Sequence, residues 1–416
     1  MGFTVPFIRI FRRIVISIID LFRVVILPEF ALFRAVEYNL VMIERFYKLE
    51  NLVNPKKVII IFGPRQVGKT TLVENYLASL TSKNVRYITG EDYGILDYFE
   101  GPYLKKLEEF VAGYDMLVID EAQKIANIGN ALKLIVDRIK TIEIIVTGSA
   151  SFELAGQVGE PLTGRKQTLN LYPIAQLELN KSFNKSELKQ QLEDFLVYGS
   201  YPEVISAKHD LRKKRKLLDE LLSSYLLKDI FELEKIKSSK ILWDLLRLLA
   251  FQIGSEVSHN ELANKLGINK KTVGRYLDLL EKAFVLHSVR GFSSNLRKEI
   301  TRKNKYYFLD NGIRNALVGN LNTIETRNDV GQLWENFIFM ERLKKRHYTG
   351  IYGNEYFWRT WDKKEIDLVE ERDDKLFGYE FKWGKKLPKA PKDWLETYHN
   401  ATYEIIDQDN YLDFIT

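Results

Sequence analysis

The chain has 416 residues, with 62 lysines and arginines, 56 aspartates and glutamates, and no cysteine. This length indicates several domains of ordinary size. The absence of cysteine excludes disulfides, thiolate zinc sites, iron–sulfur clusters and cysteine nucleophiles. The five histidines show neither HxH nor HExxH spacing, so the sequence also disfavours a histidine-rich metal site.

The net charge of +6 is unevenly distributed along the chain. Residues 262–305 contain 11 lysines and arginines but only 3 aspartates and glutamates, a local charge of +8, so the rest of the chain sums to −2. A basic segment of this kind favours contact with nucleic acid or another polyanion. Any function assigned to the protein has to account for it.

The first 27 residues combine apolar runs with a narrow charged stripe. At about 100° per residue, five charged residues share one face of a predicted amphipathic helix within the N-terminal segment 1–50: Arg9, Arg12, Arg13, Asp20 and Arg23. The charge-free runs are too short for a membrane span, and no signal-peptide cleavage site follows. We therefore expect a cytoplasmic protein whose first helix packs on the chain itself or in an oligomer interface. A membrane-surface helix and a poorly ordered leader are the alternatives.

Strand and helix patterns alternate through residues 51–180. The expected strands are Val58–Phe62, Val85–Thr89, Met116–Asp120 and Glu143–Ser149. This alternation predicts an α/β domain with a parallel sheet. A mostly helical region is expected at 181–250, two helices followed by strands at 251–320, and a helix at Gln332–Lys345 followed by strands within 321–416.

The first of these strands leads into a phosphate-binding motif. Residues 63–70 read GPRQVGKT, which matches GxxxxGK[ST] between a strand and a helix. Gly63 and Gly68 allow backbone N–H groups to surround phosphates at the helix N-terminus, Lys69 reaches the β- and γ-phosphates, and Thr70 binds Mg²⁺. The predicted nucleotide-binding set is Gly63, Pro64, Arg65, Gln66, Val67, Gly68, Lys69, Thr70 and Thr71.

Two further strands end in polar residues that suit phosphoryl transfer. MLVIDEAQ places Asp120 where it can bind Mg²⁺ and Glu121 where it can orient the attacking water. A solvated acidic pair at a strand end is the alternative. EIIVTGS places Ser149 at a carboxyl end, where it senses the γ-phosphate or caps the next turn.

These motifs together resemble a known family. GPRQVGKTTL, VIDEAQK, VTGSAS and LTGRKQTLNLYP, in this order, are similar to AAA-type P-loop ATPases of archaea and bacteria. The resemblance implies an α/β core of the AAA/ASCE type, then a helical lid, a winged helix and a nuclease-like C-terminal domain. It also implies that Arg165 contacts the γ-phosphate in cis or acts as a finger toward a neighbouring copy. An arginine that holds a loop is the alternative for Arg165.

The basic segment reads as a helix-turn-helix. Ser258 and Glu261 have capping-box spacing, and Gly267 suits a tight turn. The early turns of the second helix carry Lys270, Lys271, Thr272 and Arg275, where a recognition helix meets the major groove. VLHSVRGF and KYYFLD then suit a wing hairpin, and the phosphate contacts expected near it are Arg297, Lys298, Arg302, Lys303 and Lys305. A protein-binding module and an ATPase lid remain alternatives to DNA binding.

The C-terminal segment contains two alternating strands around residues 366–382. A tight turn between Asp373 and Asp374 places Asp367 opposite Glu380, with Lys382 on the same face. Such a cluster suits a Mg²⁺ site for phosphodiester hydrolysis, although solvated salt bridges give the same pattern. The pattern D…ExK resembles the PD-(D/E)xK nuclease superfamily, and Glu335 matches its additional helical acid.

We therefore expect a Mg²⁺-dependent ATPase that acts on nucleic acid through a winged helix and a nuclease-like domain. The predicted catalytic residues are Glu121, Ser149, Arg165, Glu335, Asp367, Glu380 and Lys382, and the metal ligands are Thr70, Asp120, Asp367 and Glu380. The expected ligands are ATP or ADP, Mg²⁺ and nucleic acid, with self-association left open. The first alternative is a nucleotide-switch scaffold whose winged helix binds protein and whose nuclease-like fold is inert. The second is an ATPase attached to a membrane through its first helix.

Overall fold

The computed structural model describes residues 43–99, 103–148, 162–226, 239–293, 303–360, 362, 364–384 and 389–416. The predicted N-terminal helix lies outside these residues, as do four predicted site residues: Ser149, Arg297, Lys298 and Arg302. Residues Glu44–Thr416 form one structural unit, to which all the features below belong.

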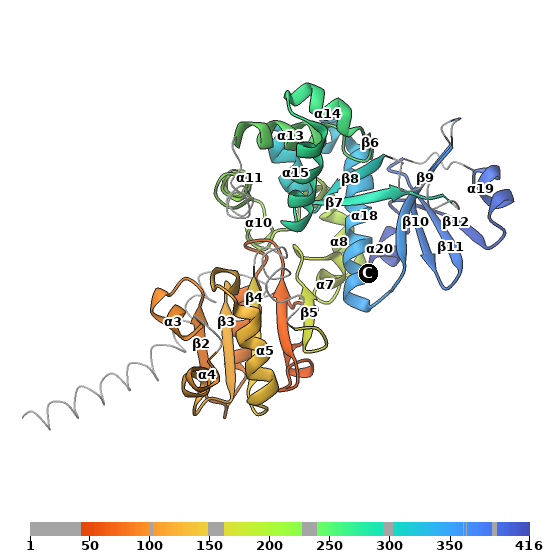
Figure 1. Ribbon diagram of the computed structural model, residues 1–416. Helices are drawn as coiled ribbons and strands as arrows, with labels where there is room; N and C mark the ends of the chain where they lie inside the picture. Colours follow the sequence, from red (N-terminus) through yellow and green to blue (C-terminus); the bar gives the residue numbers. More distant parts are fainter. Residues whose placement is uncertain are drawn as a thin grey trace, which may run out of the picture. The chain divides into compact units, whose positions relative to one another are not determined.

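Five parallel strands form the first sheet of the described chain (Figure 1). Their order is β2 (Val85–Thr89), β3 (Met116–Asp120), β4 (Glu143–Gly148), β1 (Val58–Phe62) and β5 (Lys166–Asn170). Four of these strands confirm the predicted ones, β4 as far as Gly148, where the described residues end. The sequence does not reveal β5, because this edge strand, KQTLN, buries only Leu169 and shows almost no apolar pattern.

Helices connect these strands and cover the sheet. They are α2 (Lys69–Ala78), α3 (Leu96–Phe99), α4 (Leu104–Val111) and α5 (Ile128–Arg138), with short 3₁₀ turns η1 (Leu49–Asn51), η2 (Tyr93–Ile95) and η3 (Ala122–Lys124). All five residues of β1 are buried, as expected for a parallel strand covered on both faces. One apolar cluster joins β1, β3 and β4 to α4 and α5. This core fixes the carboxyl ends of the strands, where the nucleotide site is predicted.

Helices dominate the described residues from 176 to 282. They are α7 (Gln176–Leu179), α8 (Lys185–Gln190), α9 (Leu192–Tyr198), α10 (Pro202–Ser206), α11 (Leu211–Glu220), the π-helix η4 (Leu221–Leu226), α13 (Ser239–Phe251), α14 (His259–Leu266) and α15 (Lys270–Lys282). The helical character expected for residues 181–250 is therefore present. The predicted turn between α14 and α15 is present too, with Gly267 at a φ of 65°.

A second, mixed sheet of seven strands occupies the C-terminal half of the described chain (Figure 1). Its order is β12 (Ala401–Ile406), β11 (Lys375–Phe381), β10 (Glu365–Arg372), β9 (Asn354–Arg359), β7 (Leu286–Gly291), β8 (Asn304–Phe308) and β6 (Glu256–Val257). β7 and β8 pair as the predicted antiparallel hairpin, and β7 also pairs with β9. The strands on either side of residue 320 therefore share one sheet.

The remaining helices pack around this sheet. They are α17 (Asn311–Val318), the 3₁₀ turn η5 (Ile324–Thr326), α18 (Val330–Thr349), α19 (Lys392–Thr397) and α20 (Tyr411–Ile415). The long helix α18 contacts β8, β11 and α20. Among the helices of the described residues, none has both the length and the apolar character that crossing a bilayer requires.

The hairpin of β10 and β11 confirms the predicted register. Leu368 pairs with Tyr379, and Arg372 pairs with Lys375. The turn residues Asp373 and Asp374 have φ values of 48° and 58°, as a two-residue type I′ turn requires. One step beyond the last paired residues, this register brings Asp367 opposite Glu380, as expected.

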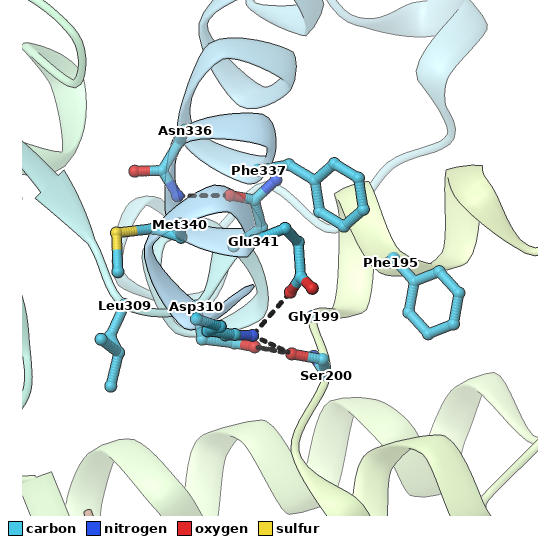
Figure 2. Close-up of a pocket in the computed structure, with 11 residues that line it drawn as sticks. Phe195, Gly199, Ser200, Leu309, Asp310, Asn336, Phe337, Met340 and Glu341 are labelled. Carbon is cyan, nitrogen blue, oxygen red and sulfur yellow. Dashed lines mark hydrogen bonds and ion pairs between the residues drawn. The ribbon is translucent and has the colours of Figure 1, made fainter. Parts of the chain in front are cut away.

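The segment YGSYPEV (Tyr198–Val204) has no role that the sequence reveals, and the structure supplies one. Ser200 donates its backbone N–H and its hydroxyl to Asp310 Oδ2, at 2.6 and 3.2 Å, while Asp310 Oδ1 accepts from Ile313 N and caps α17. Figure 2 shows Ser200 and Asp310 beside α18. The cavity between them has a volume of about 10 Å³, enough for about one water molecule, so the segment makes a structural contact and not a ligand pocket.

Gly199 is the residue on which this contact depends. It has a φ of 75°, and a Cβ at this position would lie 2.0 Å from Asp310 Oδ1. Gly267 has a similar φ of 65°, but a Cβ there would meet nothing within 4 Å. The two glycines therefore separate the cost of the backbone conformation from the cost of the collision.

We expect Gly199→Ala to lower the free energy of unfolding by about 3 kcal/mol or more, because the methyl group displaces a buried, hydrogen-bonded carboxylate. Gly267→Ala, the matched control, should cost only the ~1–2 kcal/mol of a left-handed alanine. Urea unfolding monitored by circular dichroism measures both values. Equal midpoints for the two variants would contradict the structural role of Gly199.

Candidate functional site

The predicted phosphate-binding loop joins β1 to α2. A Cβ at Gly63 would lie 2.1 Å from Leu171 O, so only glycine fits there. Gly68 precedes α2 with a φ of 90°, and the helix begins at Lys69 as predicted. The buried Lys69 donates its Nζ to Gly63 O and Pro64 O, at 2.9 Å each. Its ammonium group therefore lies against the loop that is predicted to surround the phosphates.

The remaining predicted loop residues form the turn and the first turn of α2. Gln66 adopts a positive φ of 60°, Val67 is fully buried, and Arg65 lies between Pro64 and Gln66. Thr71 is exposed on α2. The whole predicted set thus occupies one continuous strand–loop–helix connection, as a phosphate-binding loop requires.

Arg45 supports this loop, and sequence reasoning missed it. Its guanidinium donates to Val67 O at 2.7 Å, to Tyr172 O at 2.6 Å and to the Glu178 carboxylate at 2.9 Å. It also lies 3.3 Å from the Tyr348 hydroxyl of α18. Nothing in the local sequence marks Arg45, because its partners are as far as 303 positions away.

Asp120 is the meeting point of the predicted metal ligands. Thr70 Oγ1 donates to Asp120 Oδ2 at 2.9 Å, so the two predicted Mg²⁺ ligands from α2 and β3 lie side by side. Tyr87 donates its hydroxyl to the same oxygen at 3.0 Å, and Thr147 donates to Oδ1. Burial and the charge of Asp120 raise the pKa of Tyr87, which keeps this hydroxyl a donor. A hydroxyl and a carboxylate oxygen are ligands that Mg²⁺ prefers, so the site fits this ion.

Glu121 follows directly and has an unusual backbone. It adopts a φ of 50°, and its N–H donates to Thr147 Oγ1 at 3.3 Å. Its carboxylate accepts a hydrogen bond from Gln123 Nε2. These contacts anchor the carboxylate beside Asp120, whereas Ser149 lies just beyond the described end of β4.

The cis role expected for Arg165 is wrong in this structure. Arg165 precedes β5, and its carbonyl accepts from Val58 N at the start of β1, 2.8 Å away. The phosphate-binding loop follows the opposite end of β1, so the two ends are separated by the length of the strand. The Arg165 guanidinium pairs with Asp137 instead. A finger toward a neighbouring copy stays a prediction.

The predicted nucleic-acid residues of the second helix lie on its surface. Lys270, Lys271 and Arg275 are exposed, and Thr272 is half-buried. Asn269 caps the helix by accepting from Thr272 N at 2.8 Å and from its hydroxyl at 3.0 Å. The capping box expected one helix earlier is only half formed: Ser258 accepts from Glu261 N, but the Glu261 carboxylate pairs with Lys265.

The phosphate contact expected for Lys305 is wrong, although the neighbouring Lys303 is exposed as expected. Lys305 is only 1% exposed, because β8 is an inner strand of the seven-stranded sheet. Its Nζ lies 3.3 Å from Glu335 Oε1 and 4.0 Å from Asp367 Oδ1, and it pairs with Glu365. The lysine therefore belongs to the predicted nuclease-like cluster and not to a DNA-binding surface.

The nuclease-like cluster brings all four predicted residues together. Glu335 comes from α18, Asp367 from β10 and Glu380 from β11. Asp367 Oδ2 accepts from Phe381 N at 2.8 Å, and Lys382 Nζ lies 2.6 Å from Glu380 Oε1. Glu380 is 8% exposed, and its second oxygen has no hydrogen-bond partner among the described residues.

The electrostatics of this cluster show a shortage of positive charge. Burial, together with the nearby charge of Asp367, raises the pKa of Glu335 and of Glu380 to about 7. Burial also raises the pKa of Asp367. Among the described residues no three His, Asp or Glu side chains form a ready metal cage. The residues that fit a hard cation are Asp367 and the unpartnered oxygen of Glu380.

Sequence reasoning missed two members of this cluster. Glu365 had a usable signal, because residues two apart in a strand share a face and Glu365 lies two positions before Asp367. Lys305 had none, because its partners lie 30 to 62 positions further along the chain.

Comparison with family models defines the class of the first domain. Residues 55–180 match the model of an AAA domain. Residues 189–323 and 330–408 match two domains of unknown function, DUF8612 and DUF4143. The first match supports an AAA-type ATPase core, in agreement with the loop and strand geometry above.

Uncharacterized relatives match most of the chain at low identity. An uncharacterized protein of Haemophilus influenzae is 27% identical over 365 residues, covering 80% of this chain and 85% of the relative. Uncharacterized proteins of Mycobacterium tuberculosis and Methanocaldococcus jannaschii are 26% and 25% identical, covering 80% and 76% of this chain and 72% of each relative.

Two solved structures align with parts of the chain at low TM-scores. A DNA replication initiation factor aligns with a TM-score of 0.26 at 16% identity, covering 54% of this chain and 68% of that chain. Drosophila ORC bound to AT-rich DNA and Cdc6 aligns with a TM-score of 0.22 at 12% identity, covering 64% and 84%. TM-scores this low do not establish a common fold, so the activities of these proteins do not transfer to this chain.

Proposed function

We propose that the protein is a Mg²⁺-dependent ATPase whose nucleotide cycle serves a C-terminal half that acts on nucleic acid. The observation that carries the ATPase assignment is the 2.9 Å hydrogen bond between Thr70 Oγ1 and Asp120 Oδ2. It brings a hydroxyl from the start of α2 and a carboxylate from the end of β3 to one point beside the loop. Such a pair is the usual protein contribution to Mg²⁺ binding in P-loop ATPases.

The proposed chemistry assigns one task to each residue. Lys69 exchanges its bonds to the loop carbonyls for the β- and γ-phosphates, and Glu121 orients a water molecule and accepts its proton. The water oxygen bonds to the γ-phosphorus as the bond to the β-phosphate oxygen breaks, which yields ADP and phosphate. Bound Mg²⁺, held by Thr70 and Asp120, would neutralise charge on the phosphates. Ser149 as a phosphate sensor and Arg165 as a finger in trans complete the proposal.

The proposal places nucleic-acid binding on the exposed turns of α15. Lys270, Lys271 and Arg275 project from the first turns of this helix, which follows a helix and a tight turn. Phosphate contacts by such residues give affinity without reading a base sequence. The same assignment includes Thr272 on α15 and, near the β7–β8 hairpin, Arg297, Lys298, Arg302 and Lys303.

The proposal further assigns phosphodiester hydrolysis to the cluster of Glu335, Asp367, Glu380 and Lys382. The confirmed hairpin register and the unpartnered oxygen of Glu380 support it. Bound Mg²⁺ would polarise the scissile phosphate, with Asp367 and Glu380 as its carboxylate ligands. Lys382, 2.6 Å from Glu380, would steady the attacking water. The nucleotide-switch scaffold with an inert nuclease-like fold is the competing function.

Lys69→Ala should lower ATP turnover by about 100-fold or more, because the charge that holds the transferred phosphate is lost. Lys57→Ala, which removes an exposed lysine just before β1, should leave turnover unchanged. Glu121→Gln should retain ATP binding and lose about 100-fold in turnover. Phosphate release measures turnover, and a fluorescent ATP analogue measures binding. Persistent turnover in Lys69→Ala, with normal circular dichroism, would overturn the ATPase site.

Replacing Lys270, Lys271 and Arg275 by alanine together should weaken DNA binding. The slope of log K against log salt should fall by about 3, because each residue neutralises about one phosphate. The matched control replaces Lys265 and Lys282, which pair with Glu261 and Asp278 at 2.7 Å each, and should change the slope little. Fluorescence anisotropy over a salt series measures both. Binding that is independent of salt and of these residues would favour the scaffold function.

Asp367→Asn should abolish Mg²⁺-dependent nicking of supercoiled DNA, because it removes a charged ligand while keeping the side chain's shape. Asp374→Asn, in the exposed turn of the same hairpin, is the control and should nick at the wild-type rate. Gel electrophoresis over a panel of DNA and RNA structures reads the result. Nicking that is equal in both variants would remove the nuclease assignment from this cluster.

A further inference from the structure

Lys305 is a buried cation inside the acidic cluster. It is the cationic member contributed by β8, whereas the four carboxylates come from α18, β10 and β11. Its side chain is 1% exposed, so its ammonium group has left bulk water and needs partners. It takes them from Glu335, Glu365 and Asp367.

The acidic cluster contains more negative than positive side chains. When all four carboxylates are ionised, Glu335, Glu365, Asp367 and Glu380 supply four negative charges, and Lys305 and Lys382 supply two positive ones. Arg359 lies 3.8 Å from Glu365 but pairs with Glu256 at 3.4 Å, so that pair adds no net charge. The remaining charge of −2 corresponds to one divalent ion.

The geometry divides the cluster into two halves. One half, formed by Glu335 and Glu365, is already held by the Lys305 ammonium. The other half contains the unpartnered oxygen of Glu380, opposite Asp367. Two-ion hydrolytic sites hold their ions about 3.5–4 Å apart. Lys305 Nζ lies 3.3 Å from Glu335 Oε1 and 4.0 Å from Asp367 Oδ1, so it fills the space between these carboxylates that a second ion bound by both would need.

We propose that Lys305 is a tethered cation that takes the place of a second metal ion and limits this cluster to one divalent ion between Asp367 and Glu380. The inference rests on the proposed metal site at those two residues. It makes Lys305 a positioning residue, because it holds Glu335 and Glu365 away from the metal. It also explains why the described residues contain no three-carboxylate cage although four carboxylates converge.

The test counts Mn²⁺ ions bound to the full chain by electron paramagnetic resonance of free Mn²⁺, without nucleotide. The parent and every variant carry Asp120→Asn, which removes the metal-binding carboxylate beside the phosphate-binding loop, so that an ion bound there is not counted. The parent should bind one ion, which Glu380→Gln should abolish. Lys305→Met should bind two, because it keeps the apolar stem and frees three carboxylates. The double variant Lys305→Met, Glu365→Gln should return to one.

The outcomes separate this inference from the proposed nuclease. Equal counts and affinities in the parent and Lys305→Met would overturn the inference, as would two ions in the parent. No binding in the parent but one ion in Lys305→Met would overturn the metal site at Asp367 and Glu380, and with it the count of one ion, while showing that Lys305 occupies a cation position. No binding in either would overturn both. If Lys305→Met unfolds without metal, Mn²⁺ should restore its melting transition, and failure to do so while the double variant folds would also overturn the inference.

Discussion

The helix α18 buries four charged side chains, and the arrangement of both sites depends on how those charges are paired. Glu341 bonds to Lys344 at 2.6 Å and accepts from Gln176 N at 2.6 Å. Arg342 makes a two-pronged contact with Glu370, and Arg346 contacts Glu355 and Gly353 O. An uncompensated buried charge costs about 3–5 kcal/mol, so α18 has essentially one position in which all four charges have an oppositely charged partner.

That position links the two candidate sites. Near its start α18 carries Glu335 of the acidic cluster, and near its end it carries Tyr348, which contacts Arg45. Arg45 in turn holds Val67 O in the phosphate-binding loop. If the phosphate-binding loop moved away from Arg45, the buried guanidinium would lose a hydrogen-bond acceptor at a cost in free energy. The need to keep buried polar groups paired therefore holds both the phosphate-binding loop and α18 in place.

Patterns among residues close in the sequence predicted much of this structure. They did not predict ion pairs between residues far apart in the sequence. The phosphate-binding loop and the β10–β11 register depend on neighbouring residues, such as the two turn aspartates, and both appear as expected. The cis role of Arg165 was implied by the family resemblance, and the phosphate contact of Lys305 was inferred from the basic residues around it. Their true environments are set by Asp137 and by Glu335, Glu365 and Asp367, which only the folded chain brings near.

The burial of Lys305 also changes how the basic segment, residues 262–305, is interpreted. Of its cations, Lys305 is consumed by the acidic cluster, and Lys265 and Lys282 are paired along their own helices. The other exposed cations of the described segment lie on the early turns of α15, at Arg290 of β7 and at Lys303. Because β7 and β8 belong to the sheet that carries Asp367 and Glu380, and α15 contacts β7, the helix and the acidic cluster share one sheet. Part of the +8 charge therefore lies in ion pairs within the folded chain, and the basic segment is not a uniformly basic surface.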